Sequence, residues 1–132
     1  MTVKKWIILA VTLVLFSCND DEIVAPELIG TWQLSEVLAD PGDGSGTFTP
    51  VESNRTITFL STGMIESNES LCPGEITQGN GRGIYSLQDS TIIATCPDQE
   101  ISLNISFKIE GASLLLIYQC IEACAEKYVK VQ

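Results

Sequence analysis

The segment ISLNISFKI, residues 101–109, places an apolar side chain at every odd position and a polar one at every even position. Such alternation is typical of a β-strand with one face on a core and the other in solvent, because successive side chains of a strand point to opposite faces. A helix would distribute the same apolar residues around its circumference. Residues 28–34 and 55–59 alternate in the same way, and no stretch after residue 28 keeps a helical period. The sequence therefore predicts an all-β domain.

Turn-forming residues separate these runs at short intervals and divide the domain into eight predicted strands. The predicted strands are 30–38, 55–60, 64–71, 83–88, 91–96, 101–109, 113–120 and 124–131. Two longer connections, Ala39–Asn54 and Cys72–Arg82, are rich in Gly and Pro and are predicted to be loops at one end of the domain. Eight antiparallel strands joined in sequence remove exposed sheet edges most simply by closing into an up-and-down barrel, and a two-sheet β-sandwich is the alternative.

The N-terminal segment has the layout of a secretory signal peptide, with Lys4 and Lys5 before an apolar run at 6–16. The run is too short to cross a bilayer as a helix, which needs about 20 residues. It ends in Leu15-Phe16-Ser17-Cys18, which resembles the lipobox of bacterial lipoproteins apart from the bulky Phe16. The resemblance implies cleavage before Cys18 and a membrane anchor of fatty acyl chains, such as palmitate, on that cysteine.

The acidic residues that follow, Asn19 to Glu22, resemble the surface-export signal of Bacteroidota lipoproteins. This resemblance implies a location in the outer membrane at the cell surface, and a solvated tether is the alternative. The chain is thus expected to comprise a signal peptide (1–17), a lipidated acidic tether (18–27) and one domain (28–132).

The charge balance limits the partners of this domain. Removal of residues 1–17 takes away two lysines and no acid, which changes the net charge from −10 to −12. An acidic chain without His has no basic surface for a phosphate backbone, so we expect no nucleic-acid partner. The expected state is a monomer with no cofactor.

Gly30-Thr31-Trp32 on the first predicted strand, followed by this meander, resembles the opening of the lipocalin superfamily and, more narrowly, the small lipocalin-like lipoproteins of Bacteroidota. In that family the tryptophan closes one end of the barrel and a basic residue near the chain's end packs across it. The resemblance implies a structural role for Gly30 and Trp32, with Lys130 or Lys127 over the indole ring.

Four cysteines besides Cys18 lie at predicted strand ends next to the long loops, which is the open mouth of the barrel in a lipocalin-like fold. Four cysteines allow three pairings. Cys120 and Cys124 face each other across a hairpin and form the obvious local pair, which leaves Cys72 with Cys96. A zinc site is the alternative, although only one tight spacing suits zinc.

The chain is poor in catalytic signals, because it has no His, no Gly-x-Ser-x-Gly motif and no Gly-rich phosphate loop. We therefore predict that it is not an enzyme. Asp40 and Asp43 lie in a Gly-rich loop that lacks the acid pattern and final Glu of an EF-hand, and we predict no metal there.

The predicted function is the binding of a small apolar or amphipathic ligand in the barrel, and the alternative is a non-catalytic module for protein interaction or inhibition with a filled barrel. The predicted apolar wall is Ile57, Phe59, Tyr85, Leu87, Leu103, Ile105, Phe107 and Leu116. The only two arginines, Arg55 and Arg82, follow the two long loops and are candidates to meet a carboxylate head group, unless each pairs with a neighbouring acid.

Overall fold

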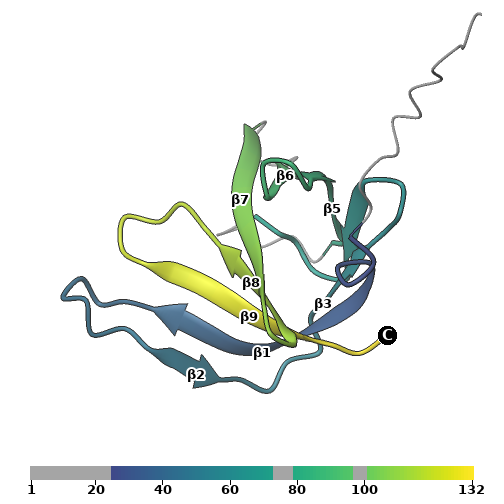
Figure 1. Ribbon diagram of the computed structural model, residues 1–132. Coiled ribbons are helices and arrows are strands. Elements are labelled where there is room, and N and C mark those ends of the chain that lie inside the picture. The colour runs from purple at the N-terminus through teal and green to yellow at the C-terminus, as the bar shows by residue number, and fades with distance from the viewer. Residues whose placement is uncertain (1–24, 73–78, 97–100) are drawn as a thin grey trace, which may run out of the picture.

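The computed structural model of the chain describes residues 25–72, 79–96 and 101–132 (Figure 1). The predicted signal peptide, Cys18 and the acidic segment after it lie outside the described residues. Within the described ranges, no helix is long and apolar enough to cross a membrane.

The described residues form nine antiparallel β-strands. These are β1 (Gly30–Ala39), β2 (Phe48–Pro50), β3 (Thr56–Phe59), β4 (Met64–Ser67), β5 (Gly81–Ser86), β6 (Thr91–Cys96), β7 (Ile101–Glu110), β8 (Ser113–Ile117) and β9 (Cys124–Lys130). Each strand from β3 to β8 pairs with the next one in sequence. Eight of the nine correspond to predicted strands, with ends that differ by up to four residues.

The sheet closes on itself through β1 and β9, whose register runs from Trp32 opposite Lys130 to Ala39 opposite Cys124. The first half of β1 pairs on its other edge with β3. Eight strands, β1 and β3 to β9, therefore form a closed up-and-down barrel, which confirms the predicted architecture. The alternative of a two-sheet sandwich is wrong, because the β1–β9 ladder joins the two ends of the meander.

The prediction that residues 39–54 form only a loop is wrong for Phe48–Pro50. This segment is strand β2, which pairs with the second half of β1 from Glu36 opposite Pro50 to Leu38 opposite Phe48. All three glycines of the segment, and Pro41, lie at positions 41–46, where the chain turns. β1 runs on beyond the end of β3, and the returning chain pairs with this part of its edge. Pro50 is tolerated there because an edge strand does not need every backbone N–H.

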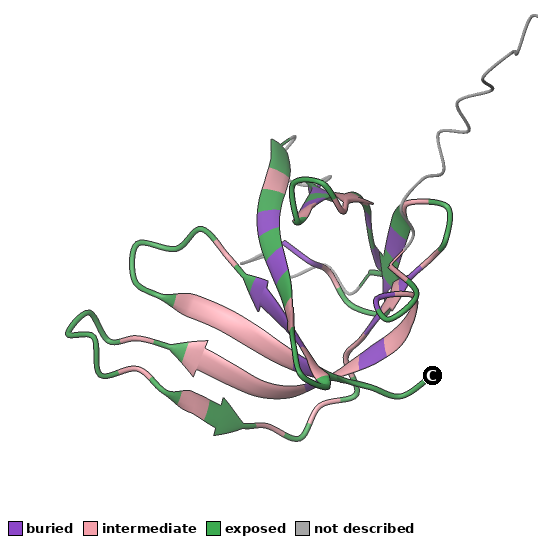
Figure 2. Cartoon of the chain, in the orientation of Figure 1, coloured by how far each residue is buried: buried purple, intermediate pink, exposed green. Residues whose placement is uncertain are grey.

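The barrel core follows the alternation of the sequence, as the banded colouring of β7 shows (Figure 2). Ile105 and Phe107 are buried, while the alternating Asn104 and Ser106 are exposed. Phe59 lies at the centre of an aromatic group and makes edge-to-face contacts with Tyr85 and Phe107, with ring centroids 5.2 and 5.8 Å apart. Such contacts add about 0.5–1.5 kcal/mol each to the burial of the rings.

One end of the barrel is closed by Trp32, as the lipocalin resemblance implies. The indole is 2% exposed and its Nε1 donates a hydrogen bond to the Leu28 carbonyl at 2.9 Å. Lys130, not Lys127, covers it, with Nζ 5.4 Å from the ring centroid.

Gly30 has φ +128°, and a Cβ there would overlap the carbonyl oxygen of Gln132. Glycine is therefore required where the last residues of the chain cross the start of β1.

Candidate functional site: the mouth pocket

A β-bulge at Ser35 changes which residues of β1 face the interior. Leu34 is opposite Tyr128, but the next pair in register is Glu36 with Lys127, so β1 carries one extra residue. Glu36 is thereby turned to the outer face, where its carboxylate accepts from Lys127 Nζ at 2.9 Å. Val37 is opposite Glu126 and faces inward with it. Bulges re-aim side chains in this way, and here the bulge builds one wall of a pocket.

The two disulfides expected from the strand directions are both present at the mouth. Cys72 is bonded to Cys96 and Cys120 to Cys124, with Cα–Cα distances of 5.8 and 6.0 Å. The first bridge is buried, with both cysteines no more than 6% exposed, whereas Cys120 lies at the surface.

A pocket of about 250 Å³ opens between these two disulfides. Its walls come from β1, β9, the end of the β8 hairpin and the chain before the first disulfide. The lining residues are Val37, Leu38, Arg55, Ser70, Leu71, Cys72, Tyr118, Cys120, Cys124, Ala125 and Glu126. The volume is just below the 300–1,000 Å³ typical of small-molecule sites, so it suits a small ligand or one end of a longer one.

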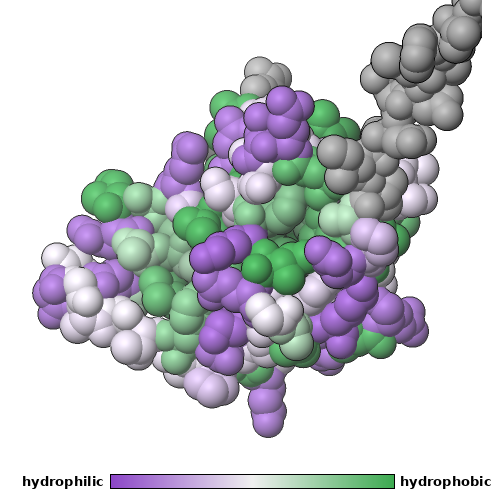
Figure 3. All heavy atoms as spheres, viewed as in Figure 1, coloured by the Kyte–Doolittle hydropathy of each residue, from purple (hydrophilic) through white to green (hydrophobic). Residues whose placement is uncertain are grey.

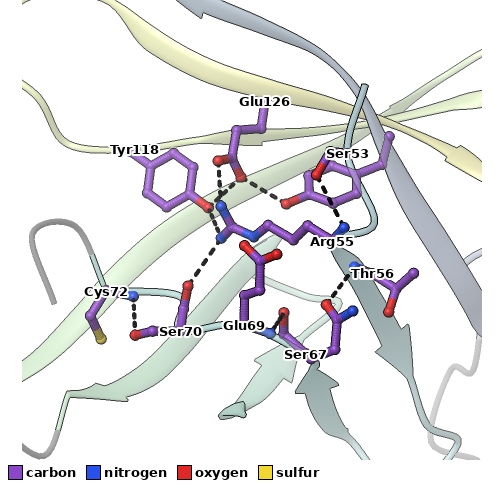
Figure 4. A network of polar contacts seen from close by, with 11 residues as sticks. Ser53, Arg55, Thr56, Ser67, Glu69, Ser70, Cys72, Tyr118 and Glu126 are labelled. Carbon is purple, nitrogen blue, oxygen red and sulfur yellow. Dashed lines mark hydrogen bonds and ion pairs between the residues drawn. The ribbon is translucent and has the colours of Figure 1, made fainter. Parts of the chain in front are cut away.

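The polar floor of the pocket is built around Arg55 (Figure 4). Its Nη1 donates to Glu126 Oε1 at 2.7 Å, and the two side chains are 14% and 16% exposed. Its Nη2 makes only long hydrogen bonds of 3.4 Å, to the Ser70 carbonyl and the Tyr118 hydroxyl. Arg55 Nε is buried without a hydrogen-bond partner among the described residues. The guanidinium is thus paired in charge, and its hydrogen bonds through Nη2 are long and therefore weak.

Glu126 is the acceptor that joins this floor into one network. Its Oε2 accepts from the Tyr118 hydroxyl at 2.7 Å and the Tyr128 hydroxyl at 2.8 Å. Burial, followed by the charge of Glu126, raises the pKa of both tyrosines far above the usual value near 10. For Arg55, burial lowers the pKa, but Tyr128, Tyr118 and Glu126 outweigh it and the net shift is upward. At neutral pH the floor therefore holds one positive and one negative charge.

The predicted apolar ligand wall lies in or against the packed core of the barrel. Ile57, Phe59, Ile105 and Leu116 are fully buried, Phe107 is 8% exposed, and Tyr85, Leu87 and Leu103 are half-buried and pack against the same core. None of these eight residues lines the mouth pocket described above. The mouth pocket is therefore lined by a different set of side chains from the predicted wall.

The two arginines are not brought together. Arg55 lies in the mouth pocket, whereas Arg82 is exposed on the outer face of β5, between the inward-facing Gly81 and Gly83. Arg55 is paired with Glu126, which is the alternative that the sequence left open for it.

Glu126, Tyr118 and Val37 were not singled out from the sequence. The sequence does indicate that Tyr118 and Glu126 face the interior. Tyr118 is two residues from the inward-facing Leu116, and Glu126 is two residues from the inward-facing Tyr128. An acid on the inner face of a barrel strand is a sign of a polar site. Val37 had no such signal, since its direction depends on the bulge.

The loop that carries Asp40 and Asp43 is held by its own backbone. The Asp40 carboxylate accepts hydrogen bonds from the N–H groups of Gly42, Gly44 and Gly46 at 2.7–3.0 Å, and Asp43 accepts from Ser45 at 2.9 Å. Hydrogen bonds from the Gly46 and Gly42 amides are the main reason why the pKa of Asp40 is lowered. Among the described residues, no group of three or more His, Cys, Asp or Glu side chains is arranged to hold a metal ion.

The barrel is similar to a solved structure, the crystal structure of a lipocalin-like protein from Bacteroides uniformis. The two superpose with a TM-score of 0.52 and 22% sequence identity, over 80% of this chain and 99% of that one. No protein-family model matches the chain, and no curated protein matches it at a significant level. At this level of identity the likeness concerns the fold alone. The chain therefore has an all-β, lipocalin-like barrel with a small pocket at its mouth.

Proposed function

We propose that this protein is a lipid-anchored binding module that takes a small, uncharged amphipathic molecule into the mouth pocket, without catalysing its conversion. The observation that carries the proposal is a pocket of about 250 Å³ held between two disulfides and floored by a polar network. The lipocalin-like fold supports it, because a closed barrel of eight strands can hold one small ligand.

The charge of the floor favours an uncharged ligand. Arg55 is already paired with Glu126 at 2.7 Å, so a carboxylate entering the pocket would meet a neutral pair inside a protein of net charge −10. A hydroxyl or carbonyl oxygen can instead accept from Arg55 Nη2, whose two hydrogen bonds are 3.4 Å long. The apolar part of the ligand would lie against Val37, Leu38 and Leu71. Burial of apolar surface there contributes about 25 cal/mol per Å².

The test uses 1-octanol and octanoate, which share chain length and differ in charge. Binding is followed by amide chemical shifts in NMR titrations of the chain. We expect 1-octanol to shift the amides around the pocket and to bind about tenfold more tightly than octanoate, which corresponds to about 1.4 kcal/mol.

Val37→Trp fills the pocket and should abolish binding, whereas Ile84→Trp, at an outer position that is 56% exposed, should leave it unchanged. Binding that survives Val37→Trp, or no binding of either probe, would reject the pocket as the site. Tighter binding of octanoate would reject the charge argument.

Anchoring rests on the lipobox-like sequence before Cys18, and surface display on the acidic residues after it. Both are part of the proposal and are independent of the pocket. The alternative function, a protein-interaction module, is supported by a different feature, the two loops that project beyond the pocket.

A further inference from the structure

Two loops project together beyond the mouth of the barrel, at the left of the view (Figure 1). They are residues 40–46, between β1 and β2, and residues 120–124, between β8 and β9, and we refer to the pair as the apex. The amide of Asp40 donates to the Ala123 carbonyl at 3.0 Å, and the Glu122 side chain lies against Gly42. The two loops therefore form one surface.

The apex presents one large aliphatic side chain to solvent. Ile121 is 102% exposed, against 56% for Ile84, the next most exposed of the large hydrophobic residues described. Figure 3 shows a hydrophobic group at the end of the β8–β9 hairpin, beside hydrophilic ones. A single exposed aliphatic residue is ordinary on a protein surface, so exposure alone does not indicate binding.

What distinguishes Ile121 is the rigidity of its support. The Cys120–Cys124 disulfide closes the loop that carries it, and the amide of Cys120 donates to the Tyr118 carbonyl at 3.1 Å. The neighbouring loop is fixed by the three amides that donate to the Asp40 carboxylate. A loop backbone held in this way loses little conformational freedom on binding, which is how pre-organised recognition loops gain affinity.

The charged side chains of the two apex loops are all acidic. Glu122 and Asp43 are exposed at the apex, and neither 39–54 nor 118–126 contains a Lys or Arg. A surface of this kind is repelled by anionic lipid head groups, and a second copy of the chain would present the same sign of charge. The complementary surface is an apolar pocket surrounded by Lys and Arg on another protein.

We propose that the apex is a protein-docking site, in which Ile121 enters an apolar pocket on a partner protein and Glu122 and Asp43 pair with basic residues at the rim of that pocket. This site is separate from the mouth pocket and does not depend on the proposed ligand.

The test is photo-crosslinking of the full chain in its native cells. Benzoylphenylalanine replaces Gln119, which is exposed just before the disulfide loop, and replaces Ile84 in the control. We expect the Gln119 probe, but not the Ile84 probe, to yield one crosslinked partner protein. The crosslinked peptide of the partner should map to apolar residues flanked by Lys or Arg. The yield should fall about tenfold in Ile121→Ser and again in about 0.5 M NaCl, because the contacts combine one apolar anchor with screened charges.

Several outcomes would overturn the proposal. These are an unchanged yield in Ile121→Ser, a yield insensitive to salt, crosslinks to lipid, crosslinks to a second copy of the chain, or no crosslink beyond that of the Ile84 probe. Cys120→Ser with Cys124→Ser should lower the yield while circular dichroism shows an intact barrel. An unchanged yield in that variant would reject the role of the rigid loop.

Discussion

At the scale of single residues, Glu126 holds the floor of the mouth pocket together, because Arg55, Tyr118 and Tyr128 all donate to it. Glu126→Gln keeps the shape of the side chain but removes the charge opposite the guanidinium. We expect it to lower the free energy of unfolding by about 2 kcal/mol, less than the ~3–5 kcal/mol typical of a fully enclosed ion pair, because both partners retain some contact with solvent. Urea unfolding at neutral pH measures this difference.

The matched control is Glu110→Gln. Glu110 also accepts from a basic side chain, Lys108, at 2.6 Å, but the two side chains are 52% and 64% exposed. We expect a loss below about 0.5 kcal/mol, as is usual for surface pairs. Equal losses in the two variants would contradict a special role for Glu126.

The tyrosines of the same network predict how stability depends on pH. Burial raises the pKa of Tyr128 above its value in the unfolded chain, which lies near 10. The folded state therefore holds this proton more tightly, and the resulting stability is complete below about pH 10 and is lost as the pH rises further. We expect the urea midpoint to fall as the pH rises above about 10, and to fall less in Tyr128→Phe, which cannot ionise. An equally steep fall in the variant would show that other groups cause it.

Residues whose roles depend only on strand direction could be predicted from the sequence. The lipocalin resemblance and the strand count together predicted that Lys130 or Lys127 covers Trp32, because β1 begins where β9 ends, and the residue there is Lys130. The pairing of Arg55 with Glu126 could not be predicted in the same way. Arg55 directly precedes β3 and Glu126 lies on β9, and these two strands are not neighbours in the barrel, so the distance between the residues depends on how the barrel closes.

At the scale of elements, the bulge in β1 is the feature that separates prediction from structure. Alternation correctly assigned Trp32 and Leu34 to the core, but beyond Ser35 the phase changes and Val37 takes the inward position. A bulge has no reliable mark in a single sequence, and the pocket wall that it creates was therefore missed. β2 was missed for a similar reason, because its pairing depends on how far β1 extends beyond β3.

The two disulfides are expected to contribute unequally to stability. Cys72–Cys96 spans 24 residues and Cys120–Cys124 spans 4. The chain-entropy estimate gives about 3.5 kcal/mol for the longer loop and about 2 kcal/mol for the shorter one. We expect Cys72→Ala with Cys96→Ala to lower the free energy of unfolding by about 1.5 kcal/mol more than Cys120→Ala with Cys124→Ala. Guanidinium unfolding of both double variants measures the difference, and the opposite order would contradict the estimate.

At the scale of the whole molecule, the closed barrel could be predicted because eight alternating runs with short turns leave few other ways to protect sheet edges. The position of the open space could not. The predicted wall of large residues, such as Phe59 and Phe107, belongs to or packs against the buried core, whereas the mouth pocket forms where the disulfides, Arg55 and the β1–β9 ladder converge. A sequence pattern reports which face of a strand is apolar, but not whether the enclosed volume is filled.

Anchoring of the whole molecule is predicted from the residues before and after Cys18. Acyl chains on that cysteine would hold the protein at a membrane by burying CH₂ groups, at about 0.8 kcal/mol each. We expect Cys18→Ala to move the protein from the membrane fraction to the soluble fraction.

Replacement of Asp20, Asp21 and Glu22 by Ala should leave it in the membrane fraction but protect it from protease added to intact cells, because only the export signal is lost. Immunoblotting of both fractions, with and without protease, follows the two variants. Replacing Asp43 and Glu122 by Ala removes acids from the apex instead and should change neither distribution, which separates the export signal from a general effect of charge. An unchanged membrane fraction for Cys18→Ala would reject the anchor, and continued protease sensitivity of the triple variant would reject the acidic residues as the signal for surface display.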